Sequence, residues 1–153
     1  MSHEEKNTVL QIIIGLIVNF YVIVKIRELY SSGAMAGPDA IQVWANTMFW
    51  IIVFAIIAGI IMAILGTILF ALIETAMTGE ADQNFVSDER DKMIGDTGNK
   101  VTMAFTGFGF IALISGIKFG YEPVDCLVVL MFCFSLGGLF GEFVKLARYR
   151  LSI

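Results

Sequence analysis

The residues that could do chemistry in this chain are concentrated in one charged stretch, residues 87–100, with the sequence SDERDKMIGDTGNK. Three carboxylates, those of Asp88, Glu89 and Asp91, stand close together there and could offer oxygen ligands to a cation. A cage of oxygen atoms around a metal normally needs more converging ligands than this. The stretch could instead dock a partner protein on the cytoplasmic face of a membrane, or it could simply begin a helix.

The same stretch has the features of a helix N-terminus. Ser87 is a suitable N-cap, and the three carboxylates would lie in the first turn, where the helix dipole favours negative charge. Acidic residues stand four positions before lysines in two pairs, in the more stabilising order: Asp88 with Lys92, and Asp96 with Lys100. We expect a short cytoplasmic helix that leads into a membrane span and is loosened before it by Gly95 and Gly98.

Seven positions of the stretch resemble a D-E-R-[D/E]-x-x-I…G-x-[R/K] signature: Asp88, Glu89, Arg90, Asp91, Ile94, Gly98 and Lys100. This signature is found in a family of small bacterial and archaeal membrane proteins that carries no assigned chemistry. The resemblance covers residues 88–100 and the layout of the spans, and it implies a class and a location but no reaction. Arginine is commoner at the last position, and Lys100 cannot replace its bidentate guanidinium group.

The composition predicts that the chain dissolves in lipid. Of its 153 residues 58% are hydrophobic and 16% are charged, against about 25% charged residues in soluble domains, and the mean hydropathy is +0.82. No basic patch or arm is present, so nucleic acid is not expected as a partner. Membrane lipid is the expected surrounding.

Four apolar runs predict an all-α integral membrane four-helix bundle in a single domain. We expect spans at about residues 8–30, 41–77, 101–119 and 124–147, with a charged connector at residues 78–100. The second run is long: 37 residues of helix measure about 55 Å, while the hydrocarbon layer is about 30 Å thick. This helix must therefore tilt or project into water.

Lysine and arginine predict the orientation. Seven of the ten stand at the two termini and in the central connector, and three stand near the other two connections: Lys6, Arg90, Lys92, Lys100, Lys145, Arg148 and Arg150 against Lys25, Arg27 and Lys118. The positive-inside rule then places both termini and the connector in the cytoplasm. The expected location is the cytoplasmic (inner) membrane of a bacterium.

Small residues predict where helices pack, because close approach replaces the hydrophobic effect between helices in lipid. Ala55, Gly59 and Ala63 begin a four-residue repeat that continues through Thr67, Ala71 and Thr75, and Gly137 with Gly141 forms a GxxxG pair. Both patterns could pack the bundle itself or could hold a second copy or a partner protein.

Few polar groups fall inside the spans. Glu142 is the carboxylate deepest in an apolar context, with Lys145 three positions on, and Asn19 and Asn46 are deeper amides. Glu142 could form a local ion pair with Lys145, and the two amides could join helices by hydrogen bonds. Alternatively, Glu142, Asn19 and Asn46 could line a transport path. Cys126 and Cys133 are about 10 Å apart on a helix, too far for a disulfide.

Several function classes lack their required residues. The first apolar run, residues 8–24, has no membrane-embedded glutamate of the kind that small multidrug exporters use, and no paired cysteines suggest thiol redox chemistry. No catalytic motif, metal site or cofactor site is predicted; the single histidine, His3, is expected to be a solvated terminal residue. The leading hypothesis is a non-enzymatic accessory or regulatory membrane protein, and the alternative is a small oligomeric transporter or channel.

Overall fold

The computed structural model describes residues 3–78 and 89–151 as four helices, with no strand in those ranges: α1 (His3–Ser31), α2 (Ala40–Thr78), α3 (Glu89–Lys118) and α4 (Pro123–Leu151). Each helix contains a stretch long and apolar enough to cross a membrane. The predicted fold class, an all-α bundle of four membrane-spanning helices, is confirmed, and the chain has the architecture of a multi-pass membrane protein.

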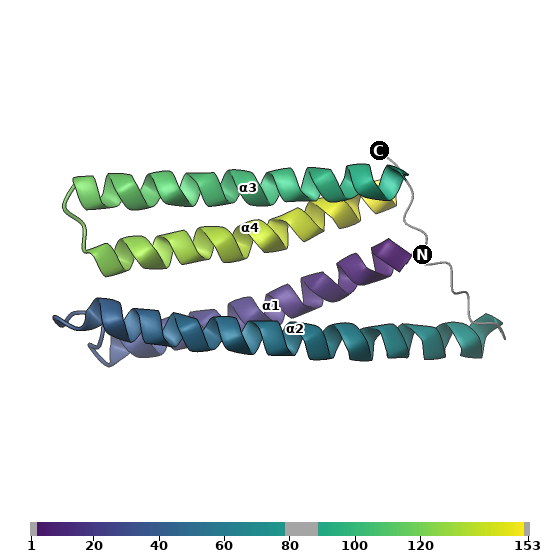
Figure 1. The fold of residues 1–153 in the computed structure, drawn as a ribbon, viewed down its shortest axis with the longest axis horizontal. Helices are drawn as coiled ribbons and strands as arrows, with labels where there is room; N and C mark the ends of the chain where they lie inside the picture. Colours follow the sequence, from purple (N-terminus) through teal and green to yellow (C-terminus); the bar gives the residue numbers. More distant parts are fainter. Residues whose placement is uncertain (1–2, 79–88, 152–153) are drawn as a thin grey trace.

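The helices lie side by side in the order α2, α1, α4, α3. The most extensive contact joins α3 to α4, α1 packs against both α4 and α2, and α2 touches α4 only locally. Figure 1 shows α1 beginning and α4 ending at one end of the bundle, opposite the two short connections at residues 32–39 and 119–122. The beginning of α1 and the end of α4, next to the two termini that the sequence predicts to be cytoplasmic, therefore lie at one end.

Glycines in left-handed backbone conformations end α1 and α3. Gly33 has a φ of 74° and Gly120 a φ of 84°, values that side chains with a Cβ atom rarely adopt. After α3, the amide of Gly120 donates to the carbonyl of Ile117, and the amide of Tyr121 donates to that of Gly116. These two hydrogen bonds define a Schellman motif. Pro123 then starts α4, where its missing N–H has no helical partner to lose.

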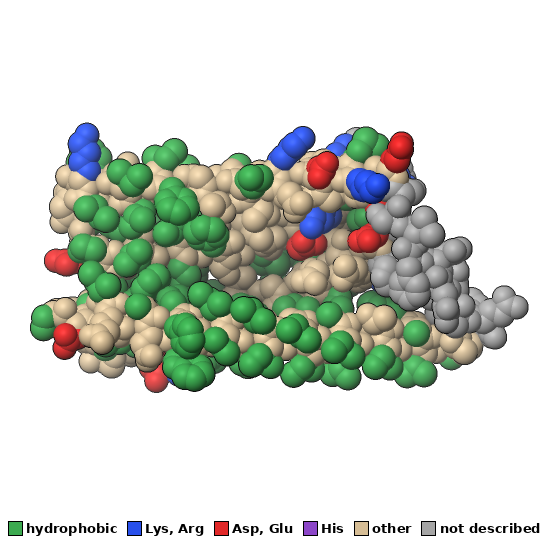
Figure 2. Space-filling model, in the orientation of Figure 1, with side chains coloured by type: hydrophobic (Ala, Val, Ile, Leu, Met, Phe, Trp, Pro, Cys, Tyr) green, Lys and Arg blue, Asp and Glu red, His purple; other side chains and the backbone are tan. Residues whose placement is uncertain are grey.

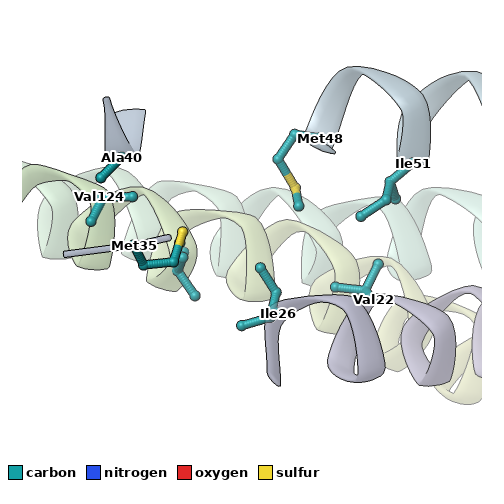
Figure 3. Packing of buried hydrophobic residues seen from close by; sticks show 8 residues of the cluster. Val22, Ile26, Met35, Ala40, Met48, Ile51 and Val124 are labelled. Atoms are coloured by element: carbon teal, nitrogen blue, oxygen red, sulfur yellow. The ribbon is translucent and has the colours of Figure 1, made fainter. Parts of the chain in front are cut away.

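The hydrophobic core lies near the end with the short connections, where three helices meet (Figure 3). It draws Val22 and Ile26 from α1, Met48 and Ile51 from α2, and Val124 with Val128 from α4, and Met35 of the first connection is buried among them. This cluster fixes the register of α1 against its two neighbours.

The third helix differs from the sequence expectation. α3 begins at Glu89 and continues unbroken to Lys118, so residues 89–100 form its first three turns and are not a separate element. Gly95 and Gly98 do not interrupt it, and Gly98 packs against Gly141 and Lys145 of α4. Figure 1 shows that α2 extends past the other helices at the end where α1 begins.

Candidate functional site

A row of glycines joins α3 to α4, and we call it the glycine seam: Gly98, Gly109 and Gly116 of α3 with Gly137 and Gly141 of α4. A Cβ atom at Gly98 would lie 2.8 Å from the carbonyl oxygen of Gly141, and a Cβ atom at Gly141 would lie 2.8 Å from that of Gly98. Contacts this short exist only because neither residue has a side chain. The glycine pair predicted to pack helices thus contacts a helix of its own chain.

The charged stretch at residues 89–100 lies at one end of this seam. Polar side chains of α3 and α4 form a group there that we call the polar end cluster: Asp91, Thr97, Glu142, Lys145, Arg148 and Tyr149. Tyr149 Oη donates to Asp91 Oδ1 at 3.0 Å, and Arg148 Nη1 donates to Thr97 Oγ1 at 2.6 Å. Figure 2 shows charged side chains gathered over the beginning of α3 and the end of α4. The charged stretch therefore docks on the last turns of α4.

Two ion pairs complete this end of the bundle. Lys145 Nζ lies 2.7 Å from Glu142 Oε1, with both side chains about four-fifths buried, and the lysine stem passes over Gly98. Arg150 Nε lies 2.8 Å from Glu5 Oε1, which ties the end of α4 to the beginning of α1. The i,i+3 pair of Glu142 and Lys145, expected from the sequence, is present.

The motif residues divide between two faces of α3. Asp91, Ile94 and Gly98 follow one another at helical spacing and face α4, and Ile94 is only 2% exposed. The other described members of the motif, Glu89, Arg90 and Lys100, are exposed. Asp88 and the expected cap Ser87 lie outside the described residues. Within residues 3–78 and 89–151, no three His, Cys, Asp or Glu side chains converge in a way that could hold a metal ion.

The three polar residues proposed from the sequence for a membrane path lie in separate places. Asn19 is buried in α1, where its amide nitrogen donates to the carbonyl of Gly15 at 2.8 Å and its oxygen accepts from Ser135 Oγ of α4 at 2.8 Å. Asn46 is exposed on α2, and Glu142 belongs to the polar end cluster. Asn19 therefore joins helices, and the monomer brings the three into no common site.

An open groove lies between α1 and α2 on the side of the short connections, with a volume of about 210 Å³. Its polar lining consists of Lys25 and Glu28 of α1 with Asn46 and Thr47 of α2, and Tyr21 and Trp50 add aromatic rings. Lys25 Nζ and Glu28 Oε2 form an ion pair of 2.8 Å. We call this feature the interfacial groove.

The small residues of α2 do not form a continuous contact within the chain. Ala55, Gly59 and Ala63 are half-buried, yet a Cβ atom at Gly59 would meet no atom within 4 Å. The repeat then turns outward, so that Thr67, Ala71 and Thr75 are exposed. The close contact of α2 with α1 falls at Gly66, against Leu10, a glycine that does not belong to the repeat.

The residues of α4 that bind the charged stretch, Arg148 and Tyr149, were not predicted from the sequence, although their spacing from Gly141 indicates them. Arg148 and Tyr149 follow Gly141 by seven and eight positions, two helical turns, so they share its face. Ser135 carried no such signal, because its partner depends on how α1 crosses α4.

Comparisons with protein-family models, with curated proteins and with solved structures find no match to this chain. The likeness of the motif to a membrane-protein signature therefore remains a prediction from residues 88–100, and the contacts within the bundle are what support a function.

Proposed function

We propose that this chain is a non-enzymatic accessory or regulatory protein of a membrane, which acts by associating with another membrane protein or with a second copy through the second half of α2. The observation that carries the proposal is the exposure of this half on several sides. Its small residues Thr67, Ala71 and Thr75 are exposed, and so are the large apolar side chains between them: Ile68, Leu69, Leu72 and Ile73.

The exposed small residues suit close contact with another helix. The hydroxyl groups of Thr67 and Thr75 donate to the carbonyls of Ala63 and Ala71 of the same helix, at 2.8 and 2.9 Å. Their outer surface is therefore methyl groups without an unpaired donor, and it can meet an apolar helix at no desolvation cost. The glycine seam shows that this chain packs helices by the same means elsewhere.

The inward face of the charged motif holds α3 against α4, which is a structural role. Asp91, Ile94 and Gly98 are engaged with α4, which leaves Glu89, Arg90 and Lys100 as the exposed part of the predicted docking surface. A transport function, the alternative expected from the sequence, would need an oligomer to complete a path, because Asn19, Asn46 and Glu142 lie apart in the monomer.

Purification from native membranes in a mild detergent tests the proposal. The wild-type chain is expected to carry a stoichiometric partner or to form a defined oligomer, and Ala71→Phe is expected to abolish this association by separating the helices. Ala104→Phe is the matched control, since Ala104 is exposed on α3. A lone monomer of the wild type, or equal association of the two variants, would contradict the proposal.

We further propose the inner membrane of a bacterium as the location, with both termini in the cytoplasm. The proposal depends on the Lys and Arg residues that stand near the termini and the central connector. Reporter fusions at residue 90 and in residues 32–39 test it. Activity at residue 90 of a reporter that works only outside the cytoplasm would show the opposite orientation and contradict the proposal.

A further inference from the structure

We propose that the interfacial groove binds the headgroup of a zwitterionic phospholipid, one that carries a phosphate and a primary ammonium group as phosphatidylethanolamine does. The groove shares no residue with the second half of α2, on which the proposed function depends. Its depth, its size and the pairing of its charges favour such a headgroup.

The groove spans one boundary of the hydrocarbon layer. Lys25 stands six residues before the end of α1 at Ser31, and Trp50 ten residues after the beginning of α2 at Ala40, which places them roughly 9 and 15 Å along their helices. A hydrocarbon layer of about 30 Å centred on α1, itself about 44 Å long, would end roughly 7 Å from that helix end. Glu28, three residues before Ser31, therefore lies roughly 2–3 Å outside this boundary, Lys25 lies roughly 2 Å inside it, and Trp50 lies deeper.

The size and surroundings of the groove favour a lipid. Its volume of about 210 Å³ is below the roughly 300–1,000 Å³ of pockets that enclose drug-sized molecules, so it accommodates a headgroup while the rest of the ligand stays outside. Towards the bundle centre, the rings of Tyr21 and Phe54 pack with their centroids 5.1 Å apart, and Phe54 is 46% exposed. Acyl chains would continue along this apolar surface.

The charges favour a zwitterion over an anion or a cation. Lys25 and Glu28 form a neutral pair, and their side chains are 37% and 63% exposed, so the pair can open at little cost. A phosphate would accept hydrogen bonds from Lys25 and the Asn46 amide, while the ammonium group would donate to Glu28. Trp50 adds an aromatic ring, which attracts an ammonium ion. An anionic headgroup would satisfy Lys25 but would stand against the carboxylate of Glu28.

Native mass spectrometry of the full chain, released from bilayers with equal amounts of phosphatidylethanolamine and phosphatidylglycerol of identical acyl chains, tests the assignment. The wild type is expected to retain phosphatidylethanolamine preferentially. Glu28→Gln is expected to lower this preference about fivefold, since it removes one exposed ion-pair partner, and Lys25→Gln is expected to lower retention of both lipids. Lys118→Gln and Glu122→Gln, exposed charges at the same end of the bundle, are the matched controls and should change neither.

Three outcomes would overturn the proposal. The first is equal retention of the two lipids by the wild type, and the second is an unchanged preference in both groove variants. The third is displacement of the lipid by free phosphoethanolamine at equal concentration, which would make a soluble zwitterion the ligand.

A second readout uses Trp44→Phe, which leaves Trp50 as the single tryptophan of the chain. Its emission should shift with phosphatidylethanolamine and not with phosphatidylglycerol, and an identical response to both would also refute the assignment.

Discussion

Substitution of Gly141 by alanine should separate α3 from α4. A Cβ atom there would lie 2.8 Å from the carbonyl oxygen of Gly98 and 2.5 Å from Thr102 Oγ1. The hydroxyl can rotate, but the carbonyl belongs to the backbone of α3, so the two helices must move apart. Overpacking of this kind costs about 1–3 kcal/mol, and the added methyl group gains about 1 kcal/mol in helix propensity.

Gly138→Ala is the matched control. Gly138 lies on the same helix as Gly141, and a Cβ atom there would meet no atom within 4 Å. The gain in propensity is common to both variants and cancels in their difference. The free energy of unfolding, measured by titration of the detergent-solubilised chain with sodium dodecyl sulfate, should therefore be about 1–3 kcal/mol lower for Gly141→Ala than for Gly138→Ala. Adding Thr102→Ala to Gly141→Ala removes the Thr102 hydroxyl but not the contact with the Gly98 carbonyl, so the double variant should not regain the lost stability. Equal stability of the two alanine variants would refute the described contact of α3 with α4.

Two further predictions follow from buried contacts. Ile94→Ala should lower the free energy of unfolding by about 2–5 kcal/mol, because Ile94 is 2% exposed. Met93→Ala, at a position 61% exposed, should change it by less than about 0.5 kcal/mol in the same titration. In a double-mutant cycle, Asn19→Ala and Ser135→Ala should show a coupling of about 0.6–2 kcal/mol from their 2.8 Å hydrogen bond; additive effects would mean that the bond does not form in the membrane.

The glycine pair of α4 shows why packing partners could be anticipated only in part. From the sequence, Gly137 and Gly141 could pack against this chain or against another, since small residues allow either. Their partner is now seen to be α3, and the charged stretch at residues 89–100 is the part of α3 that meets Gly141 and the turns after it. A hydrogen bond between Asp91 and Tyr149, 58 positions apart, depends on the register of two helices, which no local pattern encodes.

The sequence by itself determined the number of apolar spans and the helix ends at the two short connections, because hydrocarbon thickness and the conformations of Gly33, Gly120 and Pro123 act locally on the chain. Only the tertiary structure decided that residues 89–100 continue into the third span, that Ile94 is buried, and that Asn19 bonds to Ser135. The physical reason is that apolar periodicity specifies a helix and its depth in lipid, whereas the neighbour of each face is set by close contacts between glycines, and those exist only once two helices have met.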